Sequence, residues 1–207
     1  MHTPDPKSRW LTFVRHPAKV LVAGDLFVGI TAAFRTLYVL VMEIGSRRIL
    51  PYNGTAHPTA EGTLPQFREA LPGEHAYRFL IHDRDSIFGE EVDIGLANLG
   101  VGVLRTPVRA PKANAVCERW GGSLRREGLD WWIPFHERHL KMILREWITH
   151  YNRGRPPAAL GPGLPEPMSD PAPSNEHRHR LPVGHRVVKR SVLGGLHHEY
   201  GPLKEAA

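Results

Sequence analysis

Three acidic residues stand where a carboxylate is costly or unexpected, and together they could hold a metal ion. Asp25 interrupts the apolar run 20–27, Asp83 ends the apolar run 77–83, and Glu118 lies in a strongly basic segment. A buried carboxylate without a partner is expensive, so such an acid is matched by a cationic side chain or by a metal. Carboxylate oxygens are the ligands that Mg²⁺ and Mn²⁺ prefer. For Asp25 alone a salt bridge is the simpler interpretation, whereas the three acids together favour a metal site.

Helical spacing places Glu118 on a predicted helix over residues 114–129. Proline disfavours helix in the residue before it, so the helix begins only after the proline-rich basic loop that precedes it. Asn114, Glu118 and Arg125 then share one face. Two adjacent glycines at 121–122 interrupt the helix, where each costs about 1 kcal/mol relative to alanine. This cost predicts that something packs closely against the backbone there.

Alternation along the predicted strand 77–83 helps to choose between two neighbouring aspartates. One side of that strand carries four residues: Tyr77, Phe79, Ile81 and Asp83. Asp83 therefore lies at the strand end, where a sheet can fix a ligand. Asp85 falls beyond the strand beside Ser86, where it is either a secondary participant or a residue that forms a turn.

The remaining pattern predicts an α/β chain. Three strands at 20–30, 37–44 and 47–52 follow one another in the manner of an antiparallel meander. The later elements are expected as a helix at 60–70, the strand at 77–83, a helix at 90–99, a strand at 101–104, and helices at 114–129 and 136–152.

The three acids and their surroundings resemble the D, D, E triad of insertion-sequence transposases and retroviral-type integrases. Glu118 follows Asp83 by 35 positions, which is the short spacing typical of that family. Three further segments resemble family motifs: HDRDSIF at 82–88, PKANAVCERWGGSLRREGLD at 111–130 and HYNRGRP at 150–156. These motifs stand in the family's order, so the resemblance covers about residues 20–165.

This resemblance implies a ribonuclease-H-like fold, with a mixed five-stranded sheet flanked by helices. The expected domains are an irregular N-terminal arm at 1–19, the integrase catalytic core at 20–155 and a proline-rich linker with a short β-like tail at 156–207. Within the tail, two short β-like runs are expected at 186–188 and 191–193.

The activity that the resemblance implies is that of a DDE polynucleotidyl transferase, which cleaves DNA strands and transfers them during transposition and DNA integration. Two Mg²⁺ or Mn²⁺ ions would be the cofactors, with Asp25 bridging both ions, Asp83 holding one and Glu118 the other. Two alternatives stay open. The first is a truncated, inactive DNA-binding remnant, because relatives read the ends of their element with an N-terminal helix-turn-helix that has no counterpart in 1–19. A ribonuclease-H-like nuclease is the other.

The implied partners are DNA, at the element ends and the target, and further copies of the chain assembled on that DNA. No membrane partner is expected, because no apolar run approaches the length of a membrane span. No small-molecule substrate is expected either. The single cysteine excludes an internal disulfide and agrees with a reducing compartment. The expected location is the bacterial cytoplasm, with nucleoid association when DNA is bound.

Charge agrees with a polyanionic partner, because the chain carries a formal net charge of +6. The charge is uneven: residues 21–102 hold six bases and ten acids, whereas residues 103–155 hold eleven bases and five acids. An acidic, strand-rich half beside a basic, helical half suits a metal-and-phosphate site, although solvated helix faces would give the same pattern. The expected DNA contacts are Arg105, Arg109, Lys112, Asn114, Arg119, Arg125 and Arg126.

Overall fold

The computed structural model describes residues 20–32, 35–50, 53–55, 59–71, 73–106, 115–156, 163–166, 181 and 183–204. The chain forms two compact units, residues 1–141 and 142–207, and each is described by itself. The predicted arm at 1–19 lies outside the described residues, and the predicted domain boundary after residue 155 stays a prediction. Among the described residues, no helix is both long and apolar enough to cross a membrane.

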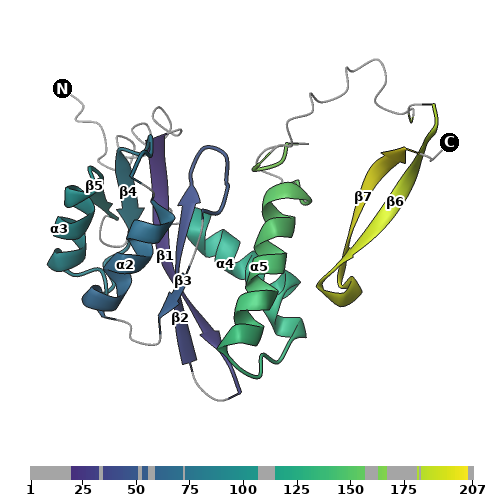
Figure 1. Ribbon diagram of the computed structural model, residues 1–207. Helices are drawn as coiled ribbons and strands as arrows, with labels where there is room; N and C mark the ends of the chain where they lie inside the picture. The colour runs from purple at the N-terminus through teal and green to yellow at the C-terminus, as the bar shows by residue number, and fades with distance from the viewer. Residues whose placement is uncertain are drawn as a thin grey trace, which may run out of the picture. The chain divides into compact units, whose positions relative to one another are not determined.

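The first unit is built on a five-stranded mixed sheet with the strand order β3-β2-β1-β4-β5 (Figure 1). The strands β1 and β2 pair antiparallel, as do β2 and β3, whereas β1–β4 and β4–β5 are parallel. Their bounds are β1 Leu21–Ile30, β2 Arg35–Glu43, β3 Asn53–Thr55, β4 Phe79–His82 and β5 Gly102–Arg105. The predicted antiparallel meander and the mixed five-stranded sheet are therefore confirmed.

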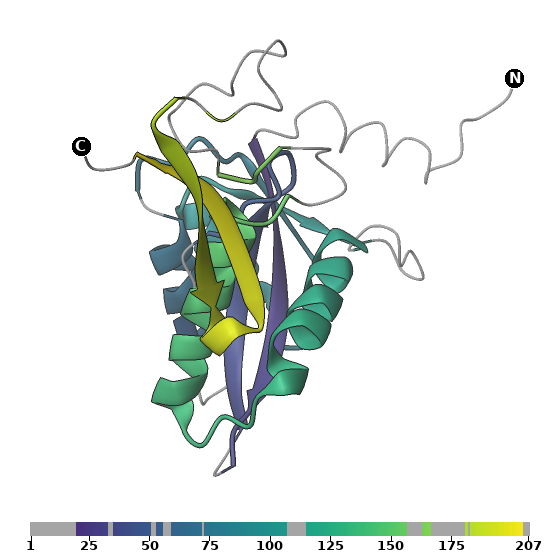
Figure 2. The same cartoon turned by 90° about the vertical axis from the view of Figure 1, so that its right-hand side faces the viewer.

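Alternate residues of β1 point to two different hydrophobic clusters, one on each face of the sheet. Val22 packs with residues of α2 (Ala60–Ala70) and α3 (Glu90–Asn98). Ala23 packs instead with Cys117 of α4 (Ala115–Glu127). In Figure 2 the teal helix α4 runs beside the purple strand β1. The sheet therefore lies between α2 and α3 on one face and α4 on the other. Helix α2 contains Pro65 in its interior.

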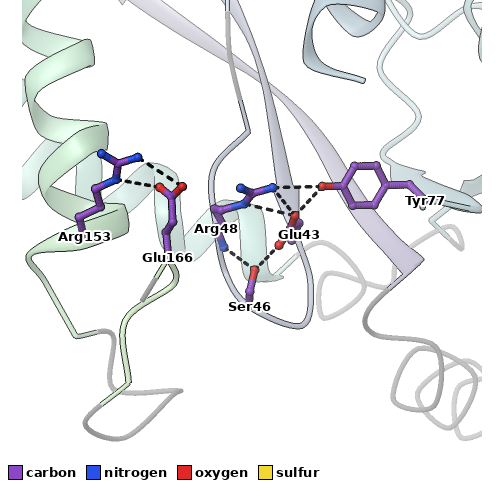
Figure 3. A network of polar contacts seen from close by, with 6 residues as sticks. All are labelled: Glu43, Ser46, Arg48, Tyr77, Arg153 and Glu166. Carbon is purple, nitrogen blue, oxygen red and sulfur yellow. Dashed lines mark hydrogen bonds and ion pairs between the residues drawn. The ribbon is translucent and has the colours of Figure 1, made fainter. Parts of the chain in front are cut away.

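The third strand differs from the prediction, because residues 47–50 follow a turn at 44–46 and form only one isolated bridge, between Ile49 and Met42. Arg47 has a positive φ of 65°, which a regular strand does not allow. A polar network holds the turn, since Glu43 accepts hydrogen bonds from Ser46, Arg48 and the Tyr77 hydroxyl (Figure 3). Residues 51–52 lie outside the described part, and the strand itself is Asn53–Thr55.

The same network explains a second difference at the start of β4. Tyr77 was expected on the side of Phe79, but it packs against the α2/α3 cluster, whereas Phe79 packs against the α4 cluster. The alternation holds only from residue 79, because β4 begins there and Tyr77 precedes it. Burial would raise the pKa of Glu43, but the hydrogen bonds from Ser46, Tyr77 and Arg48 outweigh burial and lower it.

The second unit contains the end of α5 (Glu137–Arg153) and a β-hairpin. The hairpin consists of β6 (His185–Val192) and β7 (His197–Lys204). The two predicted β-like runs are one continuous strand, and its partner was not predicted. The connection η6 (Leu193–Gly195) has three consecutive residues with positive φ, which the two glycines favour. Arg153 of α5 is paired with Glu166, and its Nε lies 3.0 Å from Oε2 of that residue (Figure 3).

Candidate active site

Asp25 lies in the middle of β1 on the face covered by α4. Leu21 and Ala23 belong to the cluster that contains Cys117 of α4, and alternation along the strand gives Asp25 the same face. The carboxylate is partly buried, and its Oδ1 accepts the N–H of Leu26 at 2.8 Å. A central strand therefore fixes this acid, with one of its oxygens already oriented.

Asp83 immediately follows the last residue of β4. Ile81 lies in the α4-side cluster, so the residue two positions later is directed to the same face as Asp25. Oδ1 of Asp83 accepts the N–H of Asp85 at 3.1 Å, which orients the carboxylate at the strand end.

Glu118 comes from α4 and completes the set. Its neighbour Cys117 is buried in the same cluster as Ala23 and Ile81, which anchors this turn of the helix against the sheet. Glu118 itself is exposed. The structure therefore brings together, on one face, acids from a central strand, a strand end and a helix.

The electrostatics of Asp25 show that these acids act on one another. Burial is the main cause that raises its pKa from 3.8 to about 6, and the Leu26 N–H offsets part of that rise. The negative charges of Asp83, Glu118 and Asp85 raise it further, in that order. No cationic side chain of the described residues is among these influences. The fold therefore concentrates negative charge around Asp25 without neutralising it.

The donor set fits a hard divalent cation, because it consists of carboxylates, which Mg²⁺ and Mn²⁺ prefer. In the described ranges, no three His, Cys, Asp or Glu side chains already stand close enough to hold one ion. The exposed Glu118 has freely rotating side-chain bonds, and a cation would supply the attraction that draws it towards Asp25 and Asp83. These three residues are the ones that would hold the metal.

Asp85 forms the turn after β4, which was one of the two predicted roles. Its Oδ1 accepts the N–H of Ile87 at 3.1 Å, and its carbonyl accepts the N–H of Phe88 at 2.9 Å. These are the bonds of an aspartate that closes a turn. Its charge nonetheless contributes to the raised pKa of Asp25.

The basic residues expected to contact DNA are only partly described. Arg119, Arg125 and Arg126 are exposed on α4, and the guanidinium of Arg125 lies 5.3 Å from the centre of the Phe27 ring. Arg105 on β5 is paired with Asp93, with Nη2 at 2.6 Å from Oδ2. The remaining three, Arg109, Lys112 and Asn114, lie outside the described residues.

The glycines of α4 do not serve the close internal packing that was predicted. A Cβ at Gly121 would meet no atom of the described chain within 4 Å. At Gly122 it would meet the guanidinium of Arg126 at 2.9 Å, and the end of so long a side chain can move away. The prediction is wrong for Gly121, where the backbone faces open space one turn after Glu118.

A group of residues that the sequence reasoning missed lies behind Asp83. His82 is fully buried, and its ring bonds to the Asp83 carbonyl and to Asp93 of α3, which also holds Arg105. A cavity of about 840 Å³ lies beside α3, and its lining includes Arg84, Asp93 and Arg105. The signal in the sequence was a histidine at a position that alternation places on the same face of β4 as the apolar Leu80.

Comparisons with known proteins agree with the fold described above. The family model of the integrase core domain matches residues 99–165. Comparison with curated protein sequences gives no significant match. Among solved structures, the catalytic core of BIV integrase superposes with a TM-score of 0.53 at 16% identity, covering 67% of this chain and 87% of that core.

Two further viral structures give similar TM-scores and sequence identities. The HTLV-2 integrase catalytic core in complex with magnesium, in its trimeric form, matches with a TM-score of 0.52 at 12% identity, over 65% of this chain and 85% of that one. The intasome of simian T-cell lymphotropic virus, in complex with the PP2A regulatory subunit B56 gamma, gives 0.54 at 11% identity. There the match covers 65% of this chain and 48% of the viral chain, so this chain spans about half of that relative.

The fold is therefore ribonuclease-H-like, as the resemblance implied, because it is similar to that of integrase catalytic cores. Within it, residues 99–165 match the integrase core domain.

Proposed function

We propose that the protein is a transposase or integrase of the DDE type, a polynucleotidyl transferase that cleaves DNA and joins a DNA 3′-hydroxyl to a target strand. The observation that carries this proposal is the raised pKa of Asp25 among Asp83 and Glu118, on one face of an integrase-type core. Acids gathered without a cation need one from outside, and a divalent metal is the cation that phosphoryl transfer uses.

In this function, Asp25, Asp83 and Glu118 would hold two Mg²⁺ or Mn²⁺ ions. When bound, such ions activate the attacking oxygen and stabilise the leaving oxygen of an in-line displacement. The protein contributes the positions of the three acids: β1 holds Asp25, the turn after β4 orients Asp83, and α4, which covers the same face of the sheet, presents Glu118. No covalent bond between protein and DNA is needed.

The arginines of α4 would hold the DNA backbone beside the acids. Arg119, Arg125 and Arg126 are exposed on the helix that carries Glu118, and phosphate contacts of this kind position DNA without reading its sequence. The contact of Arg125 with the ring of Phe27 would keep its guanidinium near β1. Binding is therefore expected to be nearly independent of sequence and strongly weakened by salt.

The assembly and location follow from the same function. The HTLV-2 core has been solved as a trimer and a dimer, and the simian viral protein within an intasome. We accordingly propose that this chain works as a homo-oligomer on DNA, joining element ends to a target. It would do so in the bacterial cytoplasm, on nucleoid DNA.

A joining assay with purified protein tests the function. A labelled duplex with a free 3′-hydroxyl is incubated with supercoiled plasmid and Mn²⁺, and both nicking and transfer of the label are measured. Wild-type protein is expected to do both, Glu118→Gln neither, and the control Glu91→Gln, an exposed acid of α3, both at the wild-type level. Nicking without joining would indicate a nuclease. DNA binding without either reaction would indicate an inactive remnant.

A further inference from the structure

Directly before Asp83, a histidine is enclosed in the apolar layer between sheet and helices. His82 has no exposed surface, and its ring stacks on Phe88 with centroids 4.6 Å apart. Alternation along β4 puts His82 on the α2/α3 face and Asp83 on the α4 face. The ring therefore lies on the opposite side of the sheet from the carboxylate that follows it.

Both ring nitrogens of His82 contact an acceptor. Nδ1 lies 2.5 Å from the carbonyl oxygen of Asp83, and Nε2 lies 2.9 Å from Oδ1 of Asp93 on α3. The second oxygen of Asp93 accepts bonds from Nε of Arg105 at 2.8 Å and from Nη2 at 2.6 Å. A continuous chain of polar contacts thus joins the Asp83 backbone to β4, α3 and β5.

The Asp83 peptide needs such support because the sheet ends there. The pairing of β4 with β5 ends at His82 and Arg105, and the Thr106 N–H still bonds the His82 carbonyl at 3.0 Å. Asp83 lies beyond the paired residues of β4 and β5. Its carbonyl oxygen is contacted by the His82 ring instead of by a neighbouring strand. Fixing that carbonyl fixes the direction in which the Asp83 side chain leaves the backbone.

We propose that Asp93, acting through His82, is a positioning residue that orients Asp83 for metal binding. Arg105 holds Asp93 in place, and its guanidinium serves this purpose instead of binding a DNA phosphate. The inference rests on the proposed function, because it takes Asp83 as a metal ligand. None of these three residues touches the metal or the DNA: they act from the far face of the sheet through one backbone carbonyl.

A merely structural role would have a different signature. If Asp93 only joined α3 to β5, its loss would lower thermal stability and leave the affinity for metal unchanged. If it positions Asp83, metal affinity falls even at temperatures where the variant is fully folded. Metal binding without DNA is therefore the informative measurement.

The experiment titrates DNA-free protein with Mn²⁺ and follows free Mn²⁺ by electron paramagnetic resonance at 15 °C. Asp93→Ala is expected to weaken binding about tenfold or more, because the His82 ring that contacts the Asp83 carbonyl loses the partner that holds it in place. Arg105→Gln, which breaks only the outer contact, is expected to weaken it two- to fivefold. The matched control Glu91→Ala removes an exposed acid from the same helix and should leave Mn²⁺ affinity within a factor of two of wild type.

DNA affinity in the presence of EDTA separates the other possibilities. It should be unchanged by Asp93→Ala, and a loss on Arg105→Gln would mean that Arg105 contacts phosphate after all. Mn²⁺ affinity equal to wild type in both variants would overturn the proposal. If Asp93→Ala does not fold, Arg105→Gln alone decides between these results. Absence of Mn²⁺ binding in the wild type would instead refute the proposed function.

Discussion

Two partly buried acids have pKa values that are shifted in opposite directions. Asp25, in the first unit, is surrounded by further acids, and burial with those charges raises its pKa to about 6. Glu199, on β7 in the second unit, contacts His150 at 2.8 Å and also pairs with Arg190. Burial would raise the pKa of Glu199 as well, but the hydrogen bonds from His150 and Arg190 outweigh burial and lower it.

The difference separates an acid that builds the fold from an acid that, in the proposed function, would serve a ligand. Glu199 has its counter-charges within the protein, so it ties the hairpin to α5 and needs nothing from solution. Asp25 has acids where Glu199 has cations, and no cationic side chain is among the influences on its pKa, so the proposed metal would supply the missing positive charge. Carboxylates whose pKa is perturbed and which have no cationic partner among the described residues are therefore the ones to examine for function.

The largest effect is expected at the acids of the unbalanced cluster. Asp83→Asn should reduce strand joining by at least about a thousandfold, because a charged metal ligand becomes neutral. Asp85→Asn should retain a tenth or more of the activity, since its amide oxygen can still accept the turn bond from Ile87. The joining assay measures both, and equal loss would make Asp85 a ligand as well.

A second prediction concerns pH and the cost of the Asp25 charge. The folded state holds the Asp25 proton more tightly than the unfolded chain, because the pKa rises from 3.8 to about 6. The stabilisation by this proton is complete below about pH 4 and is lost as pH rises through 6. In EDTA at pH 7, Asp25→Asn should therefore be more stable than wild type by about 1–3 kcal/mol.

Urea unfolding at several pH values measures this difference. The advantage of Asp25→Asn should vanish at pH 4, where wild-type Asp25 is protonated. Added Mn²⁺ should stabilise the wild type and not the variant. An advantage that is the same at every pH would mean that the carboxylate charge is not its cause.

The balanced acid should respond in the opposite direction. Glu199→Gln should lower the free energy of unfolding by about 1–2 kcal/mol at pH 7, because bonds to His150 and Arg190 lose their charge. Strand joining per folded molecule should not depend on this charge. Hydrogen exchange of the β6–β7 amides would report the loosening, and a stabilised variant would contradict the comparison.

The smallest effect is expected at the open backbone beside the acids. Gly121→Ala should raise the free energy of unfolding by up to about 1 kcal/mol, since alanine favours helix and its Cβ meets nothing within 4 Å. The matched control is Gly95→Ala on α3, where the new Cβ would lie 2.4 Å from Leu64 and must destabilise. Joining should not improve with stability in Gly121→Ala. Thermal unfolding of both variants provides the measurement.

The sequence predicted those features that depend on local pattern. The strand around Asp25 and helix α3 follow from apolar runs, helical spacing and chain order. The association of the three acids was implied by the family resemblance and not by periodicity. Tyr77 was assigned to the wrong side, because its partner Glu43 is remote in sequence and draws it away from the strand pattern. The contact of His82 with Asp93 depends on how α3 packs on β4, which spacing alone does not reveal.

The hairpin in the second unit was hidden for another reason. Strand β7 contains Gly201 and Pro202, which are both uncommon inside strands, so its sequence resembles a loop. Pro202 is tolerated because β7 has a neighbour on only one side, so a missing N–H can face away from the ladder. The pairing with β6 is therefore decided by the partner strand and the turn, not by β7 itself.

The origin of the three acids in separate elements has a consequence for how the chain folds. Asp25 and Glu118 lie 93 positions apart, and β1, β4 and α4 meet only in the finished core. An ion held between them would act as a reversible cross-link across most of the first unit, and cross-links over long loops restrict the unfolded chain most strongly. Metal concentration would then set how often the core opens, so supply of the ion would govern the lifetime of the folded protein as well as its chemistry.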